Sequence, residues 1–241
     1  MEEVAHKNTF TNYSMCLRDA VETFTKGLIN CLFDTNYEQE NGVQTKQLFF
    51  KILERLSIEN KECFWFDFQK SFTEIRGKLD LDALAFLNSD PAAKSLREVY
   101  LAYPGFYAIA VYRLSNQLLK QEINILPRMM SEFAHSATGT DIHPGAEIGD
   151  SFFIDHATGI VIGETTIIKN NVTIFQGVTL GGLQVKKNMA SVKRHPTIEN
   201  NVIDVVIGKN SIIGANVCIT ESTLENSLVA VQSENKIFQR N

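Results

Sequence analysis

The sequence predicts an α+β protein in which an all-α helical domain precedes a parallel β-solenoid. Three observations predict this fold class. Residues 1–135 contain 16 leucines against 4 in residues 136–241. Isoleucine plus valine changes in the opposite sense, from 12 to 26, and glycine rises from 4 to 10. Leucine suits helices, whereas β-branched residues suit strands and glycine suits tight corners. The third observation is a six-residue repeat in the second half.

Residues 1–135 form the predicted helical domain, with five to eight helices. Apolar residues recur at helical spacing in 48–56 and again in 106–118. Asp90 precedes Pro91, an order typical of a helix N-cap followed by the first helical residue. The Tyr-Pro-Gly triplet at 103–105 predicts a break before the next helix.

Residues 136–241 carry the repeat, which predicts a triangular solenoid. A helix cannot keep a six-residue period on one face, because position i+6 lies about 120° away from position i. One hexad makes one side of a coil and three sides make one turn, with the aliphatic residue pointing inward. The repeated positions are Ile142, Ile148, Ile154, Ile162, Ile168, Ile174, Leu180, Ile207, Ile213 and Ile219.

The repeat loses its phase between Ile198 and Ile207, which are nine residues apart. Asp204 then falls on an inward position, where a buried charge would be costly. The junction of Ile203 and Asp204 therefore marks either a true deletion or residues missing from the given sequence, and the cost of burying Asp204 favours missing residues.

Composition excludes several classes of protein. The net charge is −5 and the basic residues form no dense stripe, which argues against binding nucleic acid. No apolar stretch approaches the roughly 20 residues of a membrane span, and the start has no secretory pattern. Four scattered cysteines favour reduced thiols. A cytoplasmic location is expected.

Several motifs resemble the serine acetyltransferases, a family of hexapeptide-repeat, left-handed β-helix acyltransferases. They are Asp-Pro-Ala at 90–92, Tyr-Pro-Gly-Phe-Tyr-Ala at 103–108, Asp-Ile-His-Pro at 141–144, Asp-His-Ala-Thr-Gly at 155–159, Gly-Glu-Thr at 163–165, Gln-Gly-Val-Thr-Leu-Gly-Gly at 176–182 and Arg-His-Pro at 194–196. The similarity runs from about residue 78 to 220. It implies a left-handed β-helix and transfer of acetyl from acetyl-CoA to the hydroxyl of L-serine, without a metal, for cysteine biosynthesis.

Acetyl transfer to a hydroxyl needs a general base and a group that orients it. By the resemblance His156 is the base and Asp141 orients it. Asp141 precedes His156 by fifteen residues, close to the roughly eighteen of a coil, which predicts that the two are stacked near one another. The alternatives are that His156 is a structural histidine and that Asp141 only caps a turn.

The resemblance also assigns the substrate contacts. Asp90 and Asp155 bind the ammonium of serine, Arg194 binds its carboxylate in a two-pronged contact, and His195 approaches the hydroxyl. The alternatives are that Asp90 is only a helix cap and that Arg194 is only a surface cation.

Coenzyme A is expected along a groove between coils of adjacent subunits, near the backbone of Gly181 and Gly182. The segment 183–197 interrupts the hexads and is expected to protrude as a loop. Lys193, in this loop, either meets the phosphates of the cofactor or is a solvated lysine.

The resemblance implies a homotrimer or a hexamer, with the helical domain serving in oligomerisation and contributing Asp90 to the site. Cysteine is a possible feedback inhibitor. The terminal Asn241 argues against a complex with cysteine synthase, because many family members end in isoleucine. Three other functions stay open: acetylation of another hydroxyl acceptor, a metal-dependent hydratase with zinc on His143, His156 and His195, and a silent trimeric scaffold.

Overall fold

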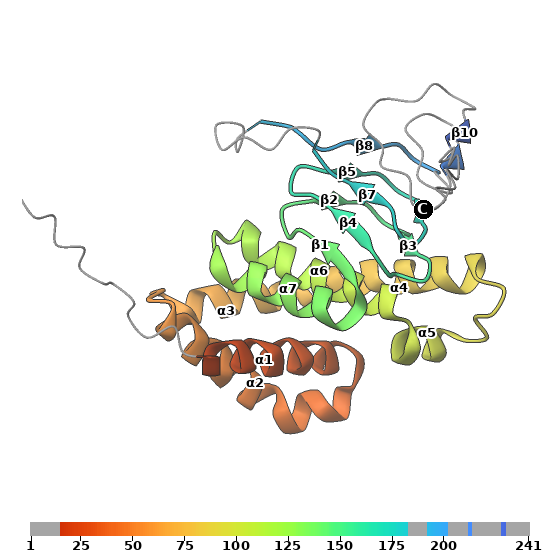
Figure 1. Ribbon diagram of the computed structural model, residues 1–241. Helices are drawn as coiled ribbons and strands as arrows, with labels where there is room; N and C mark the ends of the chain where they lie inside the picture. Colours follow the sequence, from red (N-terminus) through yellow and green to blue (C-terminus); the bar gives the residue numbers. More distant parts are fainter. Residues whose placement is uncertain (1–14, 183–191, 202–211, 214–227, 230–241) are drawn as a thin grey trace, which may run out of the picture. The chain divides into compact units, whose positions relative to one another are not determined.

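The computed structural model describes residues 15–182, 192–201, 212–213 and 228–229. The chain divides into two compact units, residues 1–66 and 67–241. Helices precede strands in the described chain, and the last helix ends at Thr138 (Figure 1). The boundary between domains at 135/136 stays a prediction.

The first unit is helical. It holds α1 (Met15–Phe33), α2 (Thr35–Arg55) and the beginning of α3 (Lys61–Lys70). Asp34 caps α2, since its carboxylate accepts the backbone N–H groups of Asn36 and Tyr37. Phe49 is fully buried, and its ring centroid lies 5.5 Å from that of Phe24. Aromatic packing therefore forms the core of this unit.

Four further helices open the second unit: α4 (Phe72–Ser89), α5 (Leu96–Ala102), α6 (Pro104–Lys120) and α7 (Ile125–Thr138). Tyr103 alone separates α5 from α6, and Pro104 is the first residue of α6, which confirms the predicted break. Gly139 ends α7 with a left-handed backbone, φ 75°.

The prediction that Asp90 is a helix N-cap is wrong, because Asp90 ends a helix instead of beginning one. It is the C-cap of α4, with an extended backbone. Its Oδ1 accepts the N–H of Ala92 at 2.8 Å, so the Asp-Pro pair forms a turn. The next helix is capped by Ser95, whose hydroxyl accepts the N–H of Glu98 at 3.2 Å. Aspartate before proline suits both a cap and such a turn, which is why the prediction was wrong.

The strands of the second unit are short and pair only in parallel, as a solenoid requires (Figure 1). Three faces are formed by β1-β4-β7, β2-β5-β8 and β3-β6, and β9 pairs with β10. Their bounds are β1 Thr140–Ile142, β2 Glu147–Ile148, β3 Phe153–Ile154, β4 Ile160–Ile162, β5 Ile167–Ile168, β6 Thr173–Ile174, β7 Thr179–Leu180, β8 Thr197–Ile198, β9 Ile212–Ile213 and β10 Leu228–Val229.

The register confirms the six-residue repeat. Ile142 pairs with Ile162, which pairs with Leu180, and all three are buried. Ile154 pairs with Ile174 on another face. The first coil contains 20 residues, because Ile154 and Ile162 are eight residues apart instead of six. The phase break at 203–204 lies outside the described residues.

A buried ion pair joins the helices to the first coil. Arg113 on α6 makes a two-pronged contact with Asp82 on α4, at 2.5 Å and 2.7 Å, and both side chains are buried. Asp82 also accepts the N–H of Phe152 at 3.0 Å, and Arg113 donates to the carbonyl of Gly149 at 2.8 Å. The pair therefore fixes α4 and α6 against the corner between β2 and β3.

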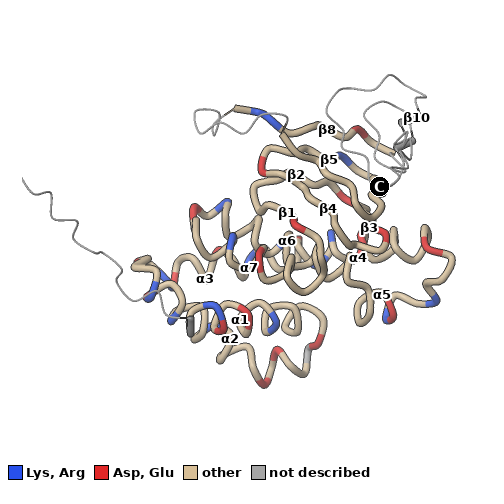
Figure 2. Tube along the Cα trace, in the orientation of Figure 1, with Lys and Arg blue, Asp and Glu red and all other residues tan. Residues whose placement is uncertain are grey.

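Acidic and basic residues alternate along the described trace, without a continuous basic stripe (Figure 2). In the same part of the chain, the helices are too short or too polar to span a membrane.

Candidate active site

The corner that follows β3 has an unusual backbone. His156 and Ala157 adopt left-handed conformations, with φ of 55° and 64°. Such a conformation costs a non-glycine residue roughly 1–2 kcal/mol and persists only where the surroundings impose it. Hydrogen bonds to neighbouring corners hold this one, since the hydroxyl of Thr140 donates to the carbonyl of Ala157 at 2.8 Å, the N–H of Gly159 donates to the carbonyl of Gly139 at 2.9 Å, and that of Gly177 donates to the carbonyl of Thr158 at 2.9 Å. Three stacked corners thereby present His156 outward.

The imidazole of His156 stands beside a carboxylate. Its Nε2 lies 3.5 Å from Oδ2 of Asp155. The His156 side chain is 71% exposed, whereas that of Asp155 is 21% exposed. The histidine is therefore open to a ligand while its neighbouring acid is largely enclosed.

Asp90 faces this corner. Tyr103 donates its hydroxyl to Oδ2 of Asp90 at 2.6 Å, and this bond holds the pKa of Asp90 below its usual range. The N–H of Ala92 and the charge of His156 act in the same direction. In return, Asp90 raises the pKa of Tyr103 to about 12. Asp90, Tyr103, Asp155 and His156 form one cluster, here called the His156 corner.

A second cluster surrounds the corner that follows β4. Thr165 donates its backbone N–H to Nδ1 of His195 at 3.0 Å. Its hydroxyl oxygen accepts the backbone N–H groups of Arg194 at 2.9 Å and His195 at 3.1 Å. We call Glu164, Thr165, Lys193, Arg194 and His195 the His195 corner.

Charges in the His195 corner are paired. Arg194 forms an ion pair with Glu164, which lowers the pKa of that glutamate. Burial lowers the pKa of His195, and the charge of Arg194 lowers it further. Burial also lowers the pKa of the neighbouring His143. Both histidines are therefore held in the neutral form near pH 7.

Similarity to known proteins shows the family to which the chain belongs. No protein-family model matches the chain. It is 41% identical over 185 residues to the plasmid-encoded serine acetyltransferase of Synechococcus elongatus, covering 70% of this chain and 58% of that protein. It is 43% identical to the serine acetyltransferase of Bacillus licheniformis over 161 residues, covering 63% and 72%. The chain belongs to the serine acetyltransferase family.

Solved structures of serine acetyltransferases confirm the predicted fold class, an N-terminal all-α domain followed by a left-handed parallel β-helix. Isoform 3 from Entamoeba histolytica, in complex with cysteine, has a TM-score of 0.73 at 29% identity and covers 92% of this chain and 84% of its own. The enzyme from Brucella abortus, in complex with coenzyme A, has a TM-score of 0.63 at 26% identity and covers 91% and 94%.

In this member of the serine acetyltransferase family, Asp141 on β1 pairs with Val161 on β4, because the first coil has 20 residues. The neighbouring Thr140 donates its hydroxyl to the carbonyl of Ala157, which follows His156, at 2.8 Å. The stacking of Asp141 near His156 stays a prediction. Its Oδ1 is buried without a hydrogen bond among the described residues, and the guanidinium of Arg128 lies 4.0 Å away. The orienting role of Asp141 stays a prediction.

Lys193 is engaged within the chain. Its ammonium donates to the backbone carbonyls of His195 at 2.5 Å, Thr165 at 2.8 Å and Pro196 at 3.2 Å. These three bonds match its three donors. They tie the turn at 194–196 to the corner after β4, and contact with a cofactor stays a prediction.

Gly181 and Gly182 follow β7, on the side where the turn at 194–196 returns. A Cβ atom on Gly182 would lie 3.2 Å from the carbonyl oxygen of Arg194, so this segment approaches the glycine closely. That Gly181 and Gly182 bind a cofactor stays a prediction. Residues 183–191 of the expected loop lie outside the described residues.

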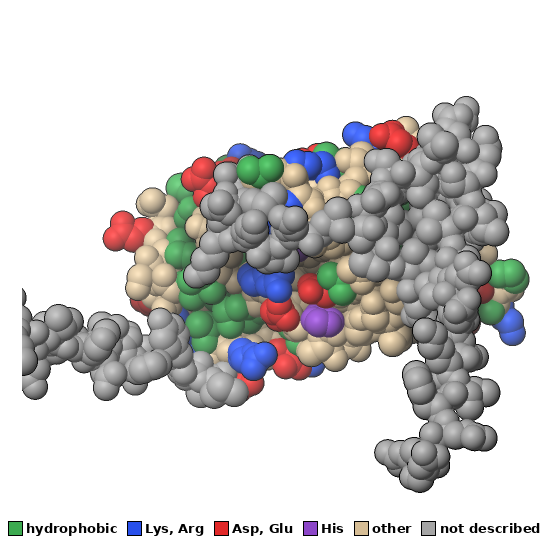
Figure 3. Space-filling model, turned by 45° about the horizontal axis from the view of Figure 1, so that its top comes forward, with side chains coloured by type: hydrophobic (Ala, Val, Ile, Leu, Met, Phe, Trp, Pro, Cys, Tyr) green, Lys and Arg blue, Asp and Glu red, His purple; other side chains and the backbone are tan. Residues whose placement is uncertain are grey.

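Sequence reasoning missed Tyr103 and Thr165 as members of the site. Both lie inside motifs that resemble the family, in Tyr-Pro-Gly and Gly-Glu-Thr, and that was the available signal. The two corners follow different strands of one coil. Figure 3 shows histidine, acidic and basic side chains gathered on one face of the described surface.

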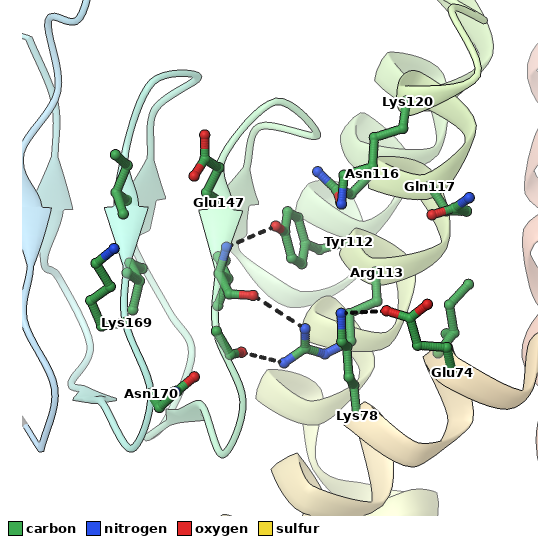
Figure 4. Close-up of a pocket in the computed structure, with 15 residues that line it drawn as sticks. Glu74, Lys78, Tyr112, Arg113, Asn116, Gln117, Lys120, Glu147, Lys169 and Asn170 are labelled. Carbon is green, nitrogen blue, oxygen red and sulfur yellow. Dashed lines mark hydrogen bonds and ion pairs between the residues drawn. The ribbon is translucent and has the colours of Figure 1, made fainter. Parts of the chain in front are cut away.

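Described residues line one cavity beside the His195 corner and another beside the helices. The smaller, of about 300 Å³, lies beside the His195 corner and is lined by Glu164, Thr165 and Lys193 among others. The larger, of about 490 Å³, lies between α4, α6 and the β2–β5 face (Figure 4). Lysines and glutamates are mixed there, and Glu74 accepts from Lys78 at 2.8 Å, which is typical of a solvated groove.

Within the described ranges, no three His, Cys, Asp or Glu side chains come close enough together to hold a metal ion.

Proposed function

We propose that the chain is a serine O-acetyltransferase, which transfers the acetyl group of acetyl-CoA to the hydroxyl of L-serine. The His156 corner carries this proposal. It presents an open imidazole beside Asp155, with the ionised carboxylate of Asp90 facing it. The sequence identity to serine acetyltransferases supports the same activity.

In the proposed reaction, the imidazole of His156 accepts the proton of the serine hydroxyl. The hydroxyl oxygen attacks the thioester carbonyl carbon, and a tetrahedral intermediate forms. The C–S bond then breaks, and the imidazolium returns its proton to the departing thiolate. O-acetylserine and coenzyme A are the products. Imidazole is the side chain most often used as a general base in such proton transfers.

The substrate is held at both ends in this proposal. Asp90 and Asp155 bind the ammonium, and Tyr103 keeps Asp90 ionised and oriented. Arg194 binds the carboxylate and His195 approaches the reacting groups. The ion pair of Arg194 with Glu164 supports this role, because it holds the guanidinium in place before substrate binds.

We infer a homotrimer, or a hexamer of two trimers, in which the His156 corner of one chain faces the His195 corner of the next. The two clusters follow different strands, β3 and β4, which supports a site shared between subunits. Mixing inactive His156→Ala and Arg194→Ala chains, unfolding them and refolding them together then restores part of the activity. Mixed assemblies without any recovered activity would argue for a site within one chain.

Gly181, Gly182 and Lys193 are proposed to contact coenzyme A. The complex of the Brucella abortus relative with coenzyme A supports this co-substrate. Cysteine is proposed to occupy the serine pocket as a feedback inhibitor, since an Entamoeba histolytica relative was solved in complex with cysteine.

An acceptor panel tests the proposal. Purified protein is incubated with acetyl-CoA and L-serine, homoserine, a sugar or no acceptor, and products are identified by mass spectrometry. We expect acetylated serine as the dominant product. Acetylation of another hydroxyl in preference to serine supports the alternative acetyltransferase. Bound zinc together with hydratase activity supports the metal enzyme, and absence of coenzyme A binding supports a scaffold.

A further inference from the structure

The hydrogen bonds around His195 determine which of its ring nitrogens carries a proton. Nδ1 lies 3.0 Å from the backbone nitrogen of Thr165. A backbone N–H can only donate, so Nδ1 must accept this bond. An accepting nitrogen carries no proton, which leaves the proton of the neutral ring on Nε2.

The hydroxyl of Thr165 strengthens this assignment. Its oxygen accepts the backbone N–H groups of Arg194 and His195, which uses both of its acceptor positions. Its own proton remains, and Nδ1 of His195 lies 2.9 Å away. The hydroxyl therefore donates to Nδ1 as well. Both donors of Thr165 favour the same ring state.

Glycine at position 163 makes room for the other edge of the ring. A Cβ atom built on Gly163 would lie 2.2 Å from both Nε2 and Cδ2 of His195. No side chain fits at that distance, so the ring can lie in this position only over a glycine. The imidazole is thus held at Nδ1 by Thr165, and the ring packs closely on Gly163.

We propose that Thr165 is a positioning residue that holds His195 in the Nε2–H tautomer, so that His195 donates a hydrogen bond to an anionic oxygen of the reactants. In this state His195 has no free lone pair and cannot be the general base, which leaves that task to His156. The assignment of the reactants rests on the proposed function. Burial and the charge of Arg194 lower the pKa of His195 and keep the ring neutral.

Nitrogen-15 NMR of the uniformly labelled wild-type protein tests the tautomer without any assay of activity. The His195 signals are identified by their loss in His195→Gln. We expect a protonated Nε2 and an unprotonated Nδ1 at pH 8. A ring protonated on Nδ1, or an equal mixture of tautomers, would overturn the proposal.

Kinetics test the consequence. Thr165→Val removes the hydroxyl and is expected to lower kcat with serine by up to about 100-fold, because misplaced catalytic groups cost rates of this order. Thr165→Ser keeps the hydroxyl and is expected to retain most of the activity. Thr166→Val is the matched control, since the hydroxyl of Thr166 makes only a 3.4 Å contact with Leu180 in the core.

Unchanged kcat and an unchanged tautomer in Thr165→Val would contradict the positioning role. If Thr165→Val does not fold, Gly163→Ala replaces it as the test, because the added Cβ displaces the same ring. An unshifted His195 spectrum in Gly163→Ala would also contradict the positioning role of Thr165. A wild-type protein that shows the Nε2–H tautomer but does not acetylate serine would refute the proposed function and leave the assignment of Thr165 intact.

Discussion

At the scale of single residues, local hydrogen bonds decide which atoms of the site are available to a substrate. Asp90 shows this well, since Tyr103 and the N–H of Ala92 each occupy one of its oxygens. A carboxylate oxygen has more than one acceptor position, so both oxygens can still receive an ammonium. The tyrosine therefore orients Asp90 without closing it.

Tyr103→Phe removes one of these bonds. We expect the pKa of Asp90 to rise toward its usual range and the KM for serine to increase about 3- to 10-fold, which corresponds to one hydrogen bond. Steady-state kinetics with serine as the varied substrate measure this. Tyr100→Phe is the control, because it removes a similar bond to Asp80, 2.8 Å long, away from the site. Equal effects of both variants would refute the role of Tyr103.

At the scale of elements, the sequence predicted the solenoid but not the details of its corners. Period-six aliphatic residues such as Ile162 and Leu180 are inward-facing in any coil, so their burial follows from spacing alone. The register of Asp141 against Val161 depends on the two additional residues between Ile154 and Ile162. Whether Asp90 caps the preceding helix or the following one depends on whether a turn or a helix follows Pro91. Hydrogen bonds from Tyr103 and Thr165 depend on packing between distant segments, which no local pattern encodes.

Gly105 and Gly77 allow two effects of glycine on stability to be separated, close packing between elements and low helix propensity. A Cβ atom on Gly105 of α6 would lie 2.5 Å from the carbonyl oxygen of Ile154 on β3, whereas one on Gly77 of α4 meets nothing within 4 Å. Gly105→Ala is expected to destabilise the protein by about 1–3 kcal/mol through overpacking. Gly77→Ala is expected to stabilise it by about 0.5–1 kcal/mol. Thermal unfolding measures both, and the same sign for both variants would contradict the packing.

The buried pair of Asp82 and Arg113 joins α4 and α6 to the first coil. Arg113→Met leaves the carboxylate of Asp82 buried without its partner, and a loss of about 3–5 kcal/mol in the free energy of unfolding is expected. Arg76→Met breaks an ion pair with Asp80 whose side chains are 37% and 46% exposed, and should cost less than about 1 kcal/mol. Denaturant unfolding compares them. Similar losses would show that the buried pair has no special role.

At the scale of the whole molecule, protonation of two partly buried histidines links stability to pH. The pKa values of His143 and His195 are lowered below the ordinary 6.5. Between the folded and unfolded pKa values the unfolded chain binds more protons, so their contribution to stability is fully present above pH 6.5 and is lost as pH falls below it. We expect the unfolding free energy to decrease from pH 7 to pH 5. Replacing both histidines by glutamine should flatten this slope, and an unaltered slope would contradict the assignment.

The proposed complete site would be shared between two chains of an assembly. One chain carries both an imidazole beside two carboxylates and an arginine beside a fixed histidine, on corners that follow different strands. The sequence indicated most of these residues through motifs, whereas their division into two corners required the coil geometry.

Serine-dependent release of the coenzyme A thiol from acetyl-CoA, in the wild type and in His156→Ala, tests whether His156 is the general base of serine acetylation. Loss of a general base predicts a decrease of about 10²- to 10⁴-fold in kcat. His135→Ala serves as the control, since that histidine lies on α7 with its side chain 44% exposed. Thiol release that does not depend on serine, or an equal rate in His156→Ala and the wild type, would contradict the account.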